Sequence, residues 1–110
     1  MNQMKLHVVL MLLALTGCGD DEDLVGGACF DDRDCVERCE RDSDFPGGFC
    51  TVSCFDDRDC PYDTICTATH GDICLFPCDF HEDCDFLGPG YFCRERRDTF
   101  DQVVFVCMGD

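Results

Sequence analysis

Cysteine is the residue type that could do most chemistry in this chain, because thirteen of its 110 residues are cysteines. Twelve of them fall into three segments of four, which begin alike: CFDDRDC at 29–35, CFDDRDC again at 54–60, and CDFHEDC at 78–84. Thiols at this density form disulfides or bind soft metal ions. Because the sequence has no C-x2-C pair, the spacing that structural zinc sites favour, we expect bridges. The predicted disulfide cysteines are Cys29, Cys35, Cys39, Cys50, Cys54, Cys60, Cys66, Cys74, Cys78, Cys84, Cys93 and Cys107.

Four cysteines in each segment predict two bridges per segment, for which three pairings exist. We favour first with third and second with fourth, because crossed bridges knot a short, loop-rich unit more effectively. Closing a 15-residue loop contributes roughly 3 kcal/mol in the chain-entropy model, so six bridges would dominate the stability of so small a chain. The expected fold class is small and disulfide-rich: tandem cysteine-rich β-hairpin and turn modules with little regular secondary structure.

The last segment carries the clearest strand signal. Residues 91–97 and 102–107 are rich in β-forming side chains, and residues 98–101 would connect them into a hairpin. Turn-forming residues precede a cysteine in each segment, at 46–48, 70–72 and 88–90. No long apolar period of 3.6 residues is present, so we expect at most a single helical turn near each aspartate-rich stretch.

Acidic side chains recur next to the cysteines and have two interpretations. Calcium takes six to eight oxygen ligands, which rigid acidic loops can supply in part. Alternatively, aspartate before cysteine favours turns or caps a short helix while it keeps the surface soluble. We favour the second interpretation, and calcium stays the one cofactor that the pattern suggests. The candidate calcium ligands are Asp32, Asp34, Asp57 and Asp59.

Charge and aromatic content narrow the choice of partner. With 24 acidic against 8 basic residues the chain repels phosphate backbones, so we exclude nucleic acid. We expect Phe30, Phe55, Phe76 and Phe86 to cover disulfides and pack between units, and any exposed aromatic patch to mark a protein-binding face. No nucleophile elbow, HExxH motif or phosphate loop is present, so we expect a non-catalytic role.

The N-terminus has the features of an export signal. Lys5 precedes an unbroken apolar run at 8–15, which is too short to span a membrane, and Leu15-Thr16-Gly17-Cys18 follows. This tetrapeptide resembles the lipobox of bacterial lipoproteins, and the resemblance implies cleavage before Cys18 and acylation of its thiol. Two or three acyl chains make anchoring to a membrane stable. Gly19 after the anchor favours the outer over the inner membrane, and removing Cys18 from the count leaves an even number of cysteines.

The repeat resembles short cysteine-rich repeats of secreted Gram-negative bacterial proteins and, more distantly, the N-terminal cysteine-rich region of Dickkopf proteins. Such spacing implies a shape rather than an activity. We expect an envelope-anchored lipoprotein with a binding or structural role toward a surface protein or glycan; a calcium-stabilised module and a small exported inhibitor or toxin are the alternatives. The expected organisation is a signal peptide (1–17), lipid anchor and acidic tether (18–28), unit 1 (29–53), unit 2 (54–77) and unit 3 (78–110).

Overall fold

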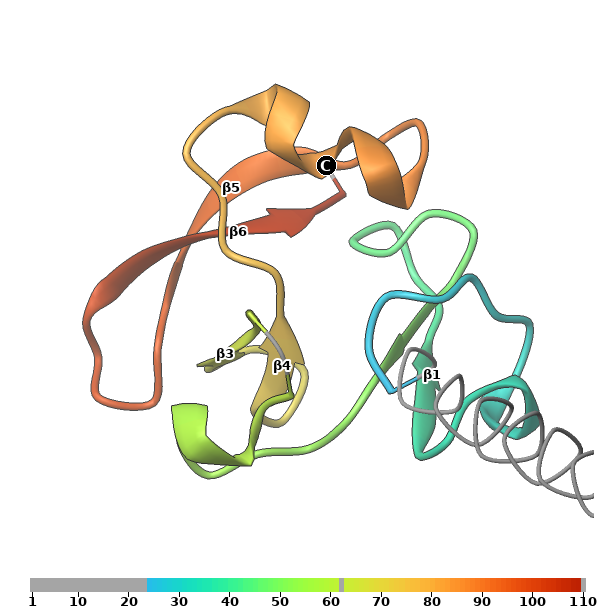
Figure 1. Cartoon of the computed structure of the whole chain (residues 1–110), viewed down its shortest axis with the longest axis horizontal. Coiled ribbons are helices and arrows are strands. Elements are labelled where there is room, and N and C mark those ends of the chain that lie inside the picture. The colour runs from blue at the N-terminus through green and yellow to red at the C-terminus, as the bar shows by residue number, and fades with distance from the viewer. Residues whose placement is uncertain (1–23, 62, 110) are drawn as a thin grey trace, which may run out of the picture.

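The computed structural model describes residues 24–61 and 63–109, so the predicted signal peptide, Cys18 and most of the acidic tether lie outside the described residues. Within these ranges three antiparallel two-stranded hairpins follow one another, each preceded by a short 3-10 helix (Figure 1). In chain order the elements are η2 (Asp32–Asp34), β1 (Arg38–Glu40), β2 (Phe49–Thr51), η3 (Asp57–Asp59), β3 (Ile65–Thr67), β4 (Ile73–Leu75), η4 (His81–Leu87), β5 (Phe92–Arg97) and β6 (Val103–Met108). The predicted fold class is confirmed.

Two disulfides staple each unit in the crossed pairing that we favoured, first cysteine with third and second with fourth. They are Cys29–Cys39, Cys35–Cys50, Cys54–Cys66, Cys60–Cys74, Cys78–Cys93 and Cys84–Cys107. The third and fourth cysteines of a unit lie opposite each other in its hairpin: Cys39 and Cys50, Cys66 and Cys74, Cys93 and Cys107. Both bridges of a unit therefore start from one cross-strand pair of the hairpin, and they hold the preceding loop, with its 3-10 helix, against the strands.

Each hairpin also binds the segment that enters its unit. The backbone N–H of the fourth cysteine donates to the carbonyl two positions before the first cysteine: Cys50 to Gly27 (2.8 Å), Cys74 to Val52 (3.1 Å) and Cys107 to Phe76 (2.9 Å). The connections between units thus have backbone hydrogen bonds of their own, which fixes each unit against the next.

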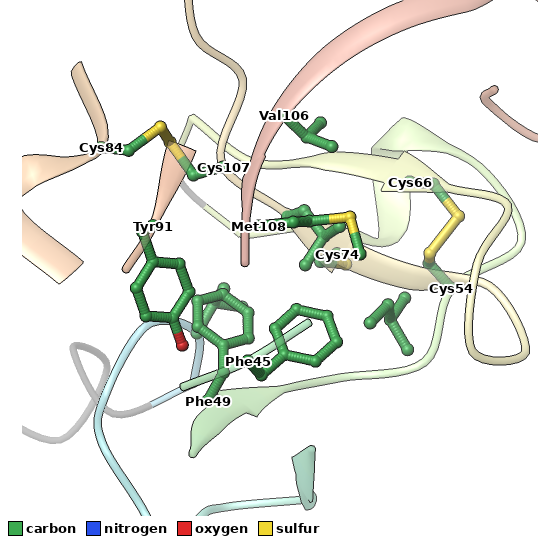
Figure 2. Close-up of a cluster of buried hydrophobic side chains, with 13 residues drawn as sticks. Phe45, Phe49, Cys54, Cys66, Cys74, Cys84, Tyr91, Val106, Cys107 and Met108 are labelled. Atoms are coloured by element: carbon green, nitrogen blue, oxygen red, sulfur yellow. A yellow bond between two sulfur atoms is a disulfide. The ribbon is translucent and has the colours of Figure 1, made fainter. Parts of the chain in front are cut away.

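The buried side chains of all three units form one core (Figure 2). Phe45 and Phe49 of unit 1 stack at 5.4 Å between ring centroids, and Phe49 also contacts Phe76 of unit 2 at 6.4 Å and Tyr91 of unit 3 at 6.3 Å. Half-cystines belong to the same core; Cys54, Cys66, Cys74, Cys84 and Cys107 are among them. The units therefore complete one another's interior, as a chain this small requires.

Unit 3 folds back onto both of the other units. The N–H of Gly109 donates to the carbonyl of Asp44 in unit 1 (2.6 Å), and the N–H of Ala68 in unit 2 donates to the carbonyl of Arg97 in unit 3 (2.8 Å). The C-terminal end of the described chain consequently lies beside unit 1 (Figure 1).

The short hairpins expected in the modules are confirmed in units 1 and 2 as well, although only unit 3 carried a clear strand signal. Strands of three residues are too short to show alternation, and here the disulfides and the entering segment hold them in place. In unit 3, β5 begins one residue later than expected and β6 is displaced by one residue toward the C-terminus. The expected single helical turn is confirmed in units 1 and 2, as a 3-10 helix, whereas η4 of unit 3 spans seven residues and is longer than one turn.

Candidate functional site

The loop after the first cysteine of each unit is held by an aspartate. Asp34, Asp59 and Asp83 stand immediately before the second cysteine, and one carboxylate oxygen of each accepts two backbone N–H groups from the start of the loop. In unit 1 the donors are Phe30 (2.8 Å) and Asp31 (3.2 Å). In unit 3 the corresponding bonds hold the pKa of Asp83 below its usual value, because they favour the charged carboxylate. The loops are therefore rigidly capped.

A second side chain in each loop binds the hairpin. The backbone N–H of the third cysteine donates to the residue three positions after the first cysteine: Cys39 to Oδ1 of Asp32 (2.8 Å), Cys66 to Oδ1 of Asp57 (2.8 Å), and Cys93 to Nδ1 of His81 (3.0 Å). Unit 3 thus keeps the hydrogen bond although it lacks the aspartate. Since Nδ1 accepts, the proton of the neutral His81 ring is on Nε2 in this arrangement.

These bonds give a structural role to the predicted calcium ligands. An oxygen of Asp32, Asp34, Asp57 and Asp59 accepts at least one backbone N–H. Among the described residues, none of the four belongs to a group of three or more ligand side chains whose atoms lie within 4.8 Å of one another. The loop-capping interpretation is confirmed, whereas calcium binding stays a prediction.

Units 1 and 2 carry an ion pair at the tip of the loop. Arg33 binds Asp31 at 3.0 Å and Arg58 binds Asp56 at 2.9 Å. Each arginine holds the pKa of its aspartate below the usual value, chiefly through the side-chain hydrogen bond. Both arginines are about nine-tenths exposed, so solvent screens these pairs and they add little to stability.

The phenylalanine of each capped loop points into solvent. Phe30 is 74% exposed, Phe55 is 89% exposed, and Phe80 of unit 3 is 67% exposed. The expectation that Phe30, Phe55 and Phe86 cover disulfides is wrong, since Phe86 too is 64% exposed. The expected packing between units is confirmed for Phe86 of unit 3 and Phe76 of unit 2, whose ring centroids are 5.0 Å apart, and Phe76 also packs against the core. The cause is the cap: the N–H of each loop phenylalanine turns inward to the aspartate, and the side chain projects outward.

Each of these rings borders a shallow hollow. In unit 1 the guanidinium of Arg41 lies 4.4 Å from the centroid of the Phe30 ring, at the edge of the hollow. All three hollows include acidic side chains: Asp42 beside Phe30; Glu37 of unit 1 with Asp59 and Asp72 of unit 2 beside Phe55; Asp79 and Glu82 beside Phe80. Each unit thus carries, on its capped loop, an exposed phenylalanine next to a hollow with carboxylates. We call these three features the aromatic loops.

A different cluster lies where unit 1 meets unit 2, and we call it the junction cluster. His70, in the turn between β3 and β4, faces three carboxylates of unit 1. Its Nε2 is 3.1 Å from Oδ2 of Asp44, and its Nδ1 is 3.5 Å from Oδ2 of Asp42 and 3.6 Å from Oε2 of Glu40. Arg38 forms an ion pair with Glu40 and donates to the carbonyl of His70 (3.3 Å). This cluster was not predictable from the sequence, because Asp44 and His70 are 26 residues apart and only the packing of two units brings them together.

No protein-family model, curated protein or solved structure matches the chain. Among residues 24–61 and 63–109, none of the helices has the length and apolar character needed to cross a membrane. Function is therefore inferred from the geometry of the aromatic loops and from the residues of the sequence.

Proposed function

We propose that this protein is a lipid-anchored component of the bacterial cell envelope that binds a protein partner without catalysing a reaction. Acylation of Cys18 would hold it at a membrane, with the outer membrane favoured by Gly19, and the acidic tether would carry the three units away from the lipid. The six disulfides support export, because such bonds persist in oxidising compartments.

The observation that carries the binding role is the threefold repetition of an exposed phenylalanine on a rigid loop. An apolar side chain in water loses hydrophobic stabilisation that burial would supply. Disulfides and aspartate caps hold Phe30, Phe55 and Phe80 in this position, so little conformational entropy is lost when a partner covers them. Aromatic anchors of this kind commonly supply most of the energy of an interface.

The surroundings of the rings indicate the chemistry of the partner. Carboxylates line every hollow, and the sequence has three times as many acidic as basic residues. A complementary surface would offer apolar sockets for the rings and lysine or arginine around them. Such a surface gains affinity from the sockets and a faster association rate from the charges.

Photocrosslinking in living cells tests this role. Benzoylphenylalanine replaces Phe30, Phe55 or Phe80 in separate variants, and Phe86 serves as the control because its exposure is close to that of Phe80 but it lies in η4, outside the loop tips. We expect the loop variants to form an adduct of one common mass and the Phe86 variant to form none. Adducts of equal yield at all four positions, or at none, would contradict the proposal.

Binding to the captured partner then measures the contribution of a ring. Phe55→Ser should weaken the affinity roughly thirtyfold, the loss of about 2 kcal/mol that defines an interface hot spot, whereas Phe86→Ser should leave it unchanged.

Measurement of the intact mass of the protein from native membranes tests the lipid anchor separately. We expect loss of residues 1–17 and added acyl chains, and release of a Cys18→Ser variant from the membrane fraction; an unlipidated wild-type chain would refute the anchor alone.

A further inference from the structure

We propose that His70, Asp42 and Asp44 bind a divalent transition-metal ion of the zinc class at the junction of units 1 and 2. One ligand atom of each residue lies within 4.8 Å of those of the other two. Asp42 and Asp44 belong to the connection between β1 and β2, and His70 to the turn between β3 and β4. The site thus draws its ligands from two units and is independent of the lipid anchor, although Asp42 also lines the hollow beside Phe30.

The distances within the junction cluster fit ligands that share an ion. Zinc binds nitrogen and carboxylate oxygen at roughly 2.1 Å, so two ligands on one tetrahedral ion lie roughly 3.4 Å apart. Nε2 of His70 lies 3.1 Å from Oδ2 of Asp44, close to this value, whereas Asp42 faces the other ring nitrogen, with its Oδ2 3.5 Å from Nδ1. The separation of 3.5 Å is long for a hydrogen bond. The ligand atoms of the three residues lie within 4.8 Å of one another, so rotation of the Asp42 side chain would bring its carboxylate to an ion held by Nε2 and Asp44.

The surroundings of His70 supply what the outer shell of such a site needs. A metal-bound histidine usually donates its other ring N–H to a carboxylate. With Nε2 bound to the ion, Nδ1 can donate to Oε2 of Glu40, 3.6 Å away. Glu40, which Arg38 holds in an ion pair, is thus the outer carboxylate.

Charge favours a doubly charged cation at this point. Three carboxylates and a single guanidinium lie around the His70 ring, so the carboxylates exceed the guanidinium by two negative charges, which one divalent ion bound to the ring would neutralise. An imidazole ligand selects zinc-class ions over calcium, which takes oxygen ligands.

The ion would reach the site from solvent and would join two units. The side chains of Asp42 and Asp44 are 47% and 30% exposed, so water can enter and complete the coordination, while that of His70 is 22% exposed and its ring contacts Phe45 at 5.1 Å. Because the ligands come from both hairpin connections, binding would stabilise the folded arrangement of unit 1 against unit 2.

Metal titration of the purified, oxidised protein tests the site. The protein is first treated with a chelator to remove bound metal, and alkylation without reduction checks that it has no free thiol. It is then titrated with Zn²⁺, followed by calorimetry, and with Co²⁺, followed by absorption spectroscopy. The variants are His70→Gln and Asp42→Asn; His81→Asp is the matched control, because it removes a histidine but restores the aspartate found in units 1 and 2. The same titration with Ca²⁺ reports binding that needs only carboxylates.

We expect one Zn²⁺ per chain for the wild type and for His81→Asp, a rise of several degrees in their Tm, and Co²⁺ bands that indicate a nitrogen ligand. Affinity should fall at least tenfold in each of the other two variants, and Asp42→Asn keeps the test informative if His70→Gln folds poorly. Absence of binding at micromolar Zn²⁺ would overturn the proposal. The proposal would also be overturned if His70→Gln bound Zn²⁺ as tightly as the wild type, or if Ca²⁺ competed with Zn²⁺ at equal affinity. Either outcome would indicate that a diffuse acidic surface, rather than this site, binds the ion.

Discussion

Asp57 offers the sharpest test of how the cysteine-rich units hold their shape. Its Oδ1 accepts the backbone N–H of Cys66 at 2.8 Å, and Cys66 is fully buried. Asp57→Ala leaves this N–H without its partner, which costs about 1–3 kcal/mol of the free energy of unfolding. Asp57→Asn keeps an oxygen in place and loses only the charge, so we expect a cost below about 1 kcal/mol. Unit 3 supports this expectation, because the neutral ring of His81 accepts the equivalent bond.

Guanidinium chloride unfolding with the disulfides intact provides the measurement, followed by far-ultraviolet circular dichroism in the presence of EDTA. The same series in calcium separates the cap from a metal ligand. The capping explanation predicts that Asp57→Asn stays close to the wild type in both buffers. It is refuted if Asp57→Asn is as unstable as Asp57→Ala, or if calcium stabilises only the wild type, since either result would mean that the charge of Asp57 is needed.

Two further predictions concern the backbone and the core. Gly48 has a φ of +83° and a Cβ there would clash with the carbonyl oxygen of Cys29, whereas Gly47, at +78°, has open space around it. Gly47→Ala should therefore cost about 1–2 kcal/mol for the left-handed backbone alone, and Gly48→Ala clearly more, by the same unfolding assay; equal costs would show that the clash is relieved. Burial raises the pKa of Tyr91 to about 12, so the folded state keeps a phenol proton that the unfolded chain loses near pH 10. Stability should be unaffected well below pH 10 and fall by up to about 2.7 kcal/mol as the pH rises through 12; Tyr91→Phe should abolish this decline, and a decline that persists in that variant would contradict the assignment.

Features that depend on local spacing were predictable from the sequence. The three units, the crossed bridges and the capping role of the aspartates all arise within about 25 residues of chain, where the cysteine spacing limits what the backbone can do. Short hairpins were expected in every unit, but the bounds of the strands in units 1 and 2 were not predictable, because three-residue strands such as Arg38–Glu40 have no alternation to detect. The outward direction of Phe30 and Phe55 was missed because it depends on which way a capped N–H turns.

Features that depend on packing between units were not predictable. The sequence suggested an array of modules, but Phe49 packs against side chains from the other two units and the buried residues form a single cluster. The junction cluster has the same origin. Nothing in the sequence near His70 indicates a partner, and the carboxylates of Asp42 and Asp44 reach it only because unit 2 folds against unit 1.

The three units also show why some positions of the repeat vary and others do not. The aspartate before the second cysteine accepts two backbone N–H groups with one oxygen, and all three units keep it. The residue three positions after the first cysteine accepts one N–H, and there a histidine substitutes in unit 3. The position two residues after the first cysteine is Asp31 in unit 1 and Asp56 in unit 2, and each accepts one exposed backbone N–H, to which water can bind equally well. In unit 3 this position is Phe80. A loop position thus tolerates substitution better when its side chain accepts fewer backbone N–H groups, and when water can replace that side chain as the acceptor. A phenylalanine can occupy this last position without loss of the cap, which is how unit 3 retains an exposed ring although its loop differs in sequence.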